Sequence, residues 1–221
     1  MNWMALHDAL LDHFGPQHWW PGETPFEVMV GAVLTQNTAW THVERAISAL
    51  KANDALSVRA ILALPDTELA ALIRPAGYFN VKTRRLKALC QFLLECGVAE
   101  APEQLAEQAP LPELRARLLA VHGVGEETAD SILLYALGLP SFVVDAYTRR
   151  SFTRLGGLTG DESYAAIQRR FHAELPADRR LFNEFHALIV ALGKHYCRPK
   201  PRCVDCPLLA VCPHAKTLPL R

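Results

Sequence analysis

Four cysteines near the end of the sequence are spaced as ligands of one soft metal centre. They follow the pattern C-x5-C-x2-C-x5-C and are Cys197, Cys203, Cys206 and Cys212. Prolines at positions 199, 201, 207 and 213 stiffen this loop, which lowers the entropy cost of gathering thiolate ligands. A zinc ribbon usually has two Cys-x2-Cys pairs, whereas this loop has one. The spacing therefore favours a [4Fe-4S] cluster over zinc, with unliganded thiols as a third interpretation.

The other cysteines and the N-terminal residues are typical of a cytoplasmic protein. Cys90 and Cys96 lie on one expected helix and point in different directions, so we expect buried free thiols. The N-terminus has polar residues such as His7 and Asp8 and resembles neither a signal peptide nor a transit peptide. No apolar run approaches the roughly 20 residues that span a bilayer. We therefore expect cysteines that bind metal or stay reduced.

Charge is balanced overall but clustered locally. The chain has 23 Lys and Arg against 23 Asp and Glu, so any affinity for nucleic acid must come from local arrangement. Either solvated helix faces or anion-binding patches explain the basic groups. They are Lys82, Arg84, Arg85 and Lys87; Arg149, Arg150 and Arg154; and Arg198, Lys200 and Arg202. The last group is less easily explained as a helix face, because it lies between two of the cysteines.

A glycine-containing turn lies between two expected helices at residues 121–125. Two glycines two residues apart allow a tight turn and a close approach of the backbone to a ligand. The N–H groups of the turn and of the next helix can then bind a DNA phosphate without reading sequence. An ordinary turn between helices explains the pattern equally well. The candidate phosphate-binding residues are His122, Gly123, Val124 and Gly125, helped by Thr128.

A carboxylate of interest lies after this turn in the sequence. Asp145 comes directly after the apolar pair Val143-Val144 and opens an expected helix. By itself it can be a plain helix cap. Its combination with the glycine turn and the terminal cysteines makes a plain cap a less complete explanation.

The elements that must position these residues are almost all helices. Apolar residues recur with helical spacing, and no segment shows the sustained alternation of a strand, so we expect an all-α fold. Caps and stops set the expected boundaries: Thr24-Pro25 before a helix at 26–34, Asp66 and Asn80 as caps, Gly97 as a stop, Asp161 as the cap of 162–175, and Asp178 as the cap of 179–195. Further helices are expected at 4–14, 40–50, 112–120 and 126–137.

Together these residues resemble the endonuclease III family of DNA glycosylases. The matching segments are "VHGVGEETADSILLYA" at 121–136, "VVDAYTRR" at 143–150 and the terminal cysteines, and the likeness runs from about Pro25 onward. The resemblance implies a helix-hairpin-helix glycosylase fold, with a six-helix barrel domain at 21–136 and a cluster domain formed by 1–20 and 137–221. It also implies a [4Fe-4S] cofactor, a catalytic Asp145 and damaged double-stranded DNA as partner. By analogy we expect a cytoplasmic, nucleoid-associated monomer of bacterial type that does not contact membranes.

Two features depart from the family pattern. The first gap between cysteines is one residue shorter than the usual C-x6-C. Bifunctional members have a lysine two residues after the second hairpin glycine, where this chain has Glu127. A lysine there attacks the sugar and forms a Schiff base, which a glutamate cannot do. The resemblance therefore indicates simple base removal, unless Lys194 takes the place of that lysine.

The N-terminal third resembles the 3-methyladenine glycosylase branch of this family. The segments are "HWWPGETPFE" at 18–27 and "VLTQNTAW" at 33–40. The resemblance implies that Gln36 fills the gap left by an extruded base. We expect Trp19, Trp20 and Trp40 to form an aromatic cage for a cationic alkylated purine, with core packing as the alternative. The chain is thus expected to be a monofunctional glycosylase. The alternatives are a bifunctional glycosylase/lyase for oxidised pyrimidines and a non-catalytic DNA-binding module.

Overall fold

The computed structural model describes residues 2–217, and all the regular elements in that range are helices or turns. The prediction of an all-α fold is confirmed. The chain forms two compact units, one of residues 20–141 and one of residues 1–19 with 142–221. We call them the 20–141 unit and the split unit. None of the helices among the described residues is long and apolar enough to cross a membrane.

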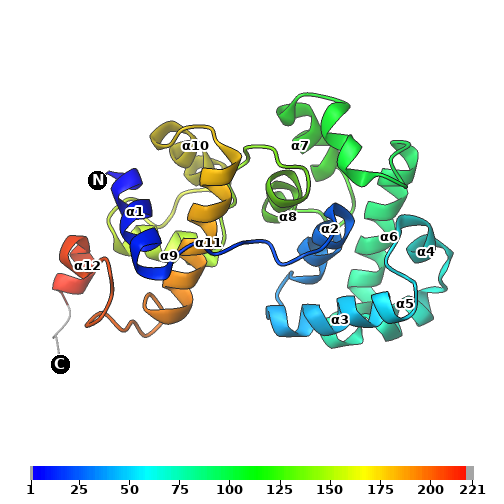
Figure 1. The fold of residues 1–221 in the computed structure, drawn as a ribbon, viewed down its shortest axis with the longest axis horizontal. Coiled ribbons are helices and arrows are strands. Elements are labelled where there is room, and N and C mark those ends of the chain that lie inside the picture. The colour runs from blue at the N-terminus through cyan, green and yellow to red at the C-terminus, as the bar shows by residue number, and fades with distance from the viewer. Residues whose placement is uncertain (1, 218–221) are drawn as a thin grey trace. The chain divides into compact units, whose positions relative to one another are not determined.

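The 20–141 unit is built around α2. This helix is apolar on all sides and almost wholly buried, and it packs against α3, α6 and α8 (Figure 1). The helices of the unit are α2 (Pro25–Leu34), α3 (Trp40–Ala52), α4 (Val58–Ala63), α5 (Asp66–Leu72), α6 (Phe79–Glu95), α7 (Leu111–Leu119) and α8 (Glu126–Ser131). Short 3-10 turns span Arg74–Ala76 (η1) and Pro102–Glu107 (η2).

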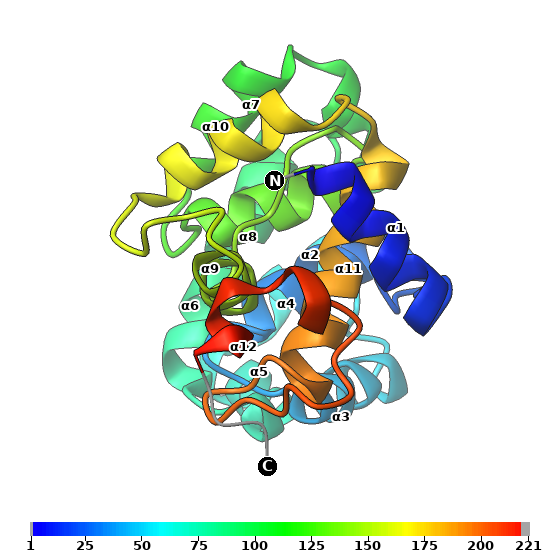
Figure 2. The ribbon, with the colours of Figure 1, turned by 90° about the vertical axis from the view of Figure 1, so that its left-hand side faces the viewer.

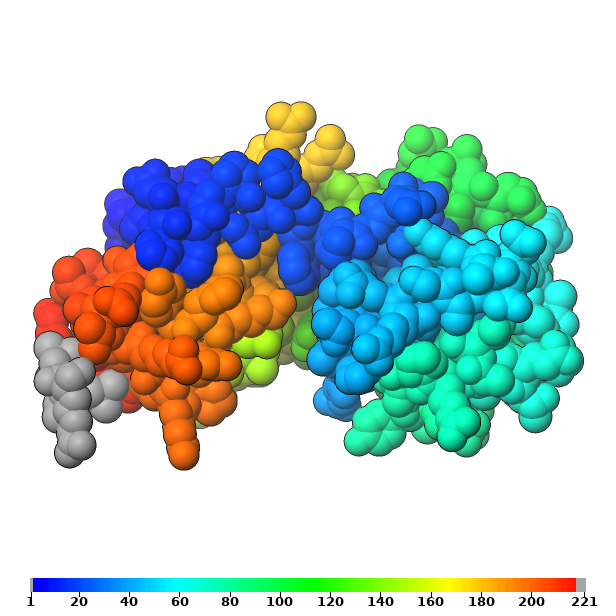
Figure 3. Space-filling view, turned by 60° about the horizontal axis from the view of Figure 1, so that its bottom comes forward, coloured from blue at the N-terminus to red at the C-terminus, as the bar shows by residue number. Residues whose placement is uncertain are grey.

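The split unit joins the two ends of the described chain around an aromatic core. Phe142 stacks on Phe171 with ring centroids 3.8 Å apart, and Trp3 meets Phe171 edge-on at 4.4 Å. Helix α1 packs against α11 and α12 against α9 (Figure 2), and α1 and the C-terminal segments share one face of this unit (Figure 3). Its helices are α1 (Trp3–Phe14), α9 (Ala146–Arg154), α10 (Tyr164–Glu174), α11 (Arg179–His195) and α12 (Pro213–Lys216).

A close approach of two helices brings the site residues of the split unit together. A Cβ atom on Gly193 of α11 would lie 2.2 Å from Cδ1 of Tyr147 on α9, so only glycine fits there. The two helix axes can therefore pack tightly at this point. This contact places the start of α9, where Asp145 lies, against the middle of α11.

Several predicted helix boundaries are correct and others are wrong. Thr24 caps α2 with Pro25 in its first turn, and Asp178 caps α11, as expected. Asn80 and Asp66 are not caps, because α6 begins at Phe79 and Asp66 is already helical. Asp161 is not the cap of α10 either; Ser163 is, and it accepts a hydrogen bond from the Ala166 N–H.

The helix expected at 126–137 changes its winding halfway. It is α-helical to Ser131 and then forms a π turn over Ile132–Ala136, in which the Leu137 N–H donates to the Ile132 carbonyl. Such a turn inserts an extra residue into the helical repeat. The apolar residues of this segment thereby stay buried past the point where α8 ends.

Candidate functional site

The hairpin connects α7 to α8 through a turn that requires its first glycine. Gly123 has φ +82°, and a Cβ atom there would lie 2.2 Å from Cγ of Arg85. Gly125 is the N-cap of α8, makes no side-chain cap, and has open space where a Cβ would lie. The side chain of Arg85 thus lies against the turn, and the start of α8 stays open.

Gln36 is hydrogen-bonded to this hairpin. Its Nε2 donates to the Gly123 carbonyl at 3.0 Å and to Oγ1 of Thr128 at 2.9 Å. Its Oε1 accepts from the Arg85 guanidinium. The structure therefore brings together three residues that sequence analysis named separately, and adds Arg85 as their partner. Thr128 itself is buried, with its hydroxyl oxygen turned to Gln36.

Two of the three tryptophans form one aromatic cluster with a tyrosine that the sequence did not suggest. Trp20 meets Trp40 edge-on with centroids 5.3 Å apart, and Tyr135 lies 5.2 Å from Trp20. Both tryptophans are half-buried against the core of the 20–141 unit. Trp19 belongs to the split unit, where the Lys194 ammonium lies 5.6 Å from its ring centroid.

Asp145 has a neighbour at each carboxylate oxygen. Its Oδ1 accepts from the Thr148 N–H at 2.7 Å, as the N-cap of α9. Its Oδ2 lies 3.6 Å from Nε2 of His186 on α11, and the two side chains are only 12% and 6% exposed. Burial alone raises the pKa of Asp145, but the His186 ring and the hydrogen bonds from Thr148 outweigh it and lower the pKa below its usual value. The carboxyl is therefore an anion at neutral pH.

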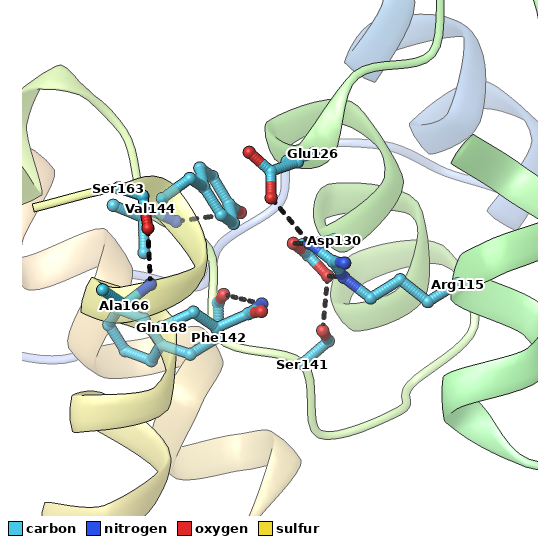
Figure 4. Close-up of polar contacts among 10 residues, drawn as sticks. Arg115, Glu126, Asp130, Ser141, Phe142, Val144, Ser163, Ala166 and Gln168 are labelled. Atoms are coloured by element: carbon cyan, nitrogen blue, oxygen red, sulfur yellow. Dashed lines mark hydrogen bonds and ion pairs between the residues drawn. The ribbon is translucent and has the colours of Figure 1, made fainter. Parts of the chain in front are cut away.

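The strand-like segment before Asp145 is fixed by α10. The Phe142 N–H donates to Nε2 of His172 at 3.2 Å, and the Phe142 carbonyl accepts from Gln168 at 2.8 Å. Two residues further, the Val144 N–H donates to the Tyr164 hydroxyl at 3.2 Å (Figure 4). These bonds orient the backbone that delivers Asp145.

A buried ion pair fixes α8 within the 20–141 unit. Asp130 is fully buried and accepts two hydrogen bonds from Arg115, at 2.9 and 3.0 Å (Figure 4). The Ser141 hydroxyl donates to the same carboxylate at 2.6 Å. A bidentate pair of this kind fixes orientation as well as position. The helix that follows the hairpin is thereby held against α7.

The four terminal cysteines line one cavity that is partly open to solvent. All four are free thiols, and burial raises the pKa of Cys206 to about 11. Within residues 2–217, no three His, Cys, Asp or Glu side chains are arranged to hold a single metal ion. The four thiol groups of the loop therefore surround one common cavity.

The second basic cluster is not a solvated helix face. Arg150 donates to the Cys197 carbonyl at 2.6 Å, and Arg154 donates to the carbonyls of Arg198 and Pro199 at 2.6 and 3.0 Å. Charged donors make strong hydrogen bonds to carbonyls. Helix α9, which is capped by Asp145, therefore holds the cysteine loop with its last two turns.

The first basic cluster also differs from expectation, because Lys82 is buried. Sequence analysis equally missed His186, which follows Asp145 by 41 positions with no local pattern to link them, and Tyr78, which is 71% exposed with φ +47°. Exposed aromatic residues with left-handed backbone are rare, but neither property is visible in a sequence. Cys90 is a buried free thiol as expected, whereas Cys96 is half-buried and accepts from Arg117.

Comparisons with known proteins agree with the fold and the hairpin. A Methanocaldococcus jannaschii protein named as a DNA repair glycosylase is 48% identical over 207 residues, which cover 94% of each chain. Endonuclease III of Bacillus subtilis is 26% identical over 194 residues, covering 85% of this chain and 80% of the relative. Residues 30–177 match the description of the HhH-GPD superfamily of base excision DNA repair proteins.

Solved structures extend the likeness to the whole fold. A non-covalent complex of endonuclease III with DNA has a TM-score of 0.82 and 25% identity, covering 96% of this chain and 94% of that one. An H. pylori 3-methyladenine DNA glycosylase bound to 1,N6-ethenoadenine has a TM-score of 0.75 and 28% identity, covering 88% and 98%.

An all-helical chain whose hairpin joins α7 to α8, and whose structural relatives include DNA complexes, is a DNA-binding repair protein of the endonuclease III type. The chain belongs to the HhH-GPD superfamily of base excision DNA repair proteins, and it is a DNA glycosylase of that superfamily. The resemblance drawn from the sequence is confirmed.

Proposed function

We propose that the protein is a monofunctional glycosylase that hydrolyses the N-glycosidic bond of an alkylated purine of the 3-methyladenine type. The observation that carries the proposal is the Asp145 carboxylate, which is 12% exposed, accepts a hydrogen bond at Oδ1, lies 3.6 Å from His186 at Oδ2 and is kept ionised. The name of the H. pylori relative supports the class of base. Glu127 supports hydrolysis over strand cleavage, because it offers no amine to attack the sugar.

In this proposal Asp145 stabilises the charge that develops on the sugar. Breaking the glycosidic bond gives the sugar oxocarbenium character, and a fixed carboxylate lowers the energy of that cation. The carboxylate also orients the attacking water. An alkylated purine already leaves readily, so a single carboxylate is enough. The contacts with Thr148 and His186 preorganise Asp145 for this role.

The hairpin is proposed to hold the DNA backbone while the damaged nucleotide leaves the stack. His122 to Gly125, with Thr128, would bind a phosphate through backbone N–H groups, and Gln36 would fill the vacated position in the duplex. The hydrogen bonds from Gln36 to Gly123 and Thr128 support a common role, because they join the two proposed DNA contacts.

The cluster of Trp20, Trp40 and Tyr135 is our proposal for the aromatic surface that selects an electron-poor base. Trp19 is a further candidate for contacting the base, because its indole ring also offers an aromatic face. We also propose that the 20–141 unit is the barrel domain of the family and the split unit its cluster domain, in a cytoplasmic, nucleoid-associated monomer.

The cysteine loop is proposed to bind a [4Fe-4S] cluster. Cys197, Cys203, Cys206 and Cys212 fit such a group because all four thiols line one cavity, as ligation by four cysteines requires. When bound, the cluster supplies rigid cross-links within the loop and no step of base removal. Arg150 and Arg154 would carry this rigidity into α9 and support the basic residues Arg198 to Arg202 on the DNA.

The function is tested with methylated duplex DNA. We expect release of free 3-methyladenine, with strand breaks appearing only after alkali, because no amine attacks the sugar. Borohydride should trap no covalent species with the native protein, whereas Glu127→Lys should give one. Breaks without alkali would mean a lyase, with Lys194 as the first residue to replace. Release of oxidised pyrimidines alone would point to the bifunctional class, and tight binding with no release to a binding module.

Removing His186 is expected to make base release more sensitive to acid. The ring lowers the pKa of Asp145, so the native protein should stay active as the pH falls through the usual range of aspartate. His186→Gln keeps a hydrogen-bond donor but removes the imidazole ring, so the pH of half-maximal single-turnover release should move to a higher value than in the native protein. His195→Gln, an exposed position on the same helix, serves as the control. Identical pH profiles for native and His186→Gln protein would contradict the assigned role.

A further inference from the structure

Lys82 is a charged residue buried in the 20–141 unit. It is only 1% exposed, yet its ammonium donates three hydrogen bonds: to the Leu34 carbonyl at 2.7 Å, to the Thr38 hydroxyl at 2.6 Å and to the Ala76 carbonyl at 2.8 Å. All three acceptors are neutral oxygens. The three donors of an ammonium group match them one for one.

Keeping this charge inside the protein is costly. Burial, with help from the nearby Arg85 guanidinium, lowers the pKa of Lys82 to about 8. Lys82 is therefore still mainly protonated at pH 7, but less firmly than a surface lysine. An apolar residue of similar length would avoid the cost of the charge while leaving three oxygens without a donor. The position is thus built for an ammonium.

The three acceptors come from the segment that carries Gln36, a proposed DNA contact, and from the turn before the exposed Tyr78. Leu34 ends α2 and Thr38 precedes α3, so the residues between them include Gln36. Ala76 ends the turn η1, two residues before the exposed side chain of Tyr78. Thr38 also donates directly to the Ala76 carbonyl at 2.6 Å. One ammonium on α6 thus joins the Gln36 segment to the Tyr78 turn.

Each segment contains a residue with left-handed backbone, and for the bulky Tyr78 that conformation is strained. Asn37 has φ +53° and Tyr78 has φ +47°, a left-handed conformation that costs energy outside glycine. A conformation of this kind persists only where surrounding contacts fix it. The bonds of Lys82 reach the backbone or side chain within two residues of both positions.

We infer that Lys82 is a positioning residue for opening the DNA duplex: its buried ammonium fixes the segment that carries Gln36 against the turn that carries Tyr78, so that both side chains meet the base stack as one unit. The inference rests on the proposed glycosylase function of this chain. Lys82 itself touches neither the DNA nor the reacting bond.

The test compares a paired lesion with one that is already unpaired. Lys82→Met keeps the aliphatic stem but removes the donors. We expect single-turnover release to fall at least about 10-fold when the lesion faces a normal base, and less than about 3-fold when it faces an abasic residue, because the cost of unpairing is then small. Thr38→Val, which weakens the same junction from the loop side, should change the two rates in the same direction.

Lys87→Met is the matched control. Lys87 lies on the same helix and also donates to a backbone carbonyl, that of Leu64, but away from the Gln36 segment. For Lys87→Met, the ratio of the release rate from the paired lesion to that from the unpaired lesion should equal the ratio for the native protein. The inference would be overturned if Lys82→Met lowered the release rate equally on both substrates, or on neither. An equal loss would indicate a general loss of structure, which affects paired and unpaired lesions alike.

A separate readout keeps this inference apart from the proposed function. The fluorescence of 2-aminopurine placed beside the lesion reports base unstacking on binding, without any chemistry. Native protein should raise it more than Lys82→Met does, at saturating protein. Failure of the native protein to release any alkylated purine would refute the proposed substrate, while an equal rise with both proteins would refute the role of Lys82.

Discussion

Asp145→Asn is expected to abolish base release without loss of DNA binding. The substitution removes the negative charge that faces the developing cation, and we expect the single-turnover rate to fall by at least about 1000-fold. Asparagine caps helices about as well as aspartate, so α9 should still begin at residue 146 and keep its hold on the cysteine loop. The measurement is base release together with the dissociation constant for lesion-containing DNA.

Asp178→Asn is the matched control for this prediction. Asp178 is also an N-cap aspartate, accepting from the N–H groups of Arg180 and Leu181 at the start of α11. It differs in that its side chain lies at an exposed position. Its variant should release base within about 2-fold of the native rate, since Asn preserves the cap. A native rate for Asp145→Asn, or loss of DNA binding along with activity, would remove Asp145 from the proposed chemistry.

Cys206→Ser is expected to remove the metal centre and much of the stability of the split unit. Binding a structural metal contributes directly to folding, so we expect the visible absorption of an iron–sulfur cluster to be lost and the Tm to fall by more than about 10 °C. Iron and sulfide analysis, absorption and thermal denaturation measure this, with no need for an active enzyme.

Cys96→Ser provides the comparison for the metal prediction. Cys96 is also a free thiol, but it is the C-cap of α6 and lies outside the cavity of the four terminal cysteines. Its variant should retain native iron content and absorption. One zinc ion per native chain and no iron would show that the loop is a zinc site and contradict the cluster.

Local sequence predicted helix starts correctly where a segment offered a single capping residue. Thr24 with Pro25, and Asp178 before a long amphipathic helix, define helix starts through contacts within four residues, and both predictions hold. Around α10 the sequence Asp161-Glu162-Ser163 offers three capping side chains. Ser163 caps the helix, while Glu162 turns back to bind the N–H groups of Thr159 and Gly160. Local chemistry does not rank such competitors.

Long-range partners account for most of what the sequence did not predict. Helical periodicity made Lys82 part of a basic face, but only the packing of α6 against α2 and η1 turns it toward three carbonyl and hydroxyl oxygens. His186 likewise meets Asp145 only because Gly193 lets α9 approach α11 closely. The types of these residues can be read from the sequence, whereas the partners they contact depend on the fold.

The hydrogen bonds from α9 to the cysteine loop restrict where the length of that loop can change. The carbonyls of residues 197, 198 and 199 are bound by Arg150 and Arg154, and the N–H of Arg202 is bound by the Tyr196 carbonyl. We therefore expect an insertion or deletion between the first two cysteines to disturb these bonds least at Lys200 and Pro201. The single residue by which this gap departs from C-x6-C is expected to fall at the same two positions, and replacing Arg150 or Arg154 is expected to loosen the loop.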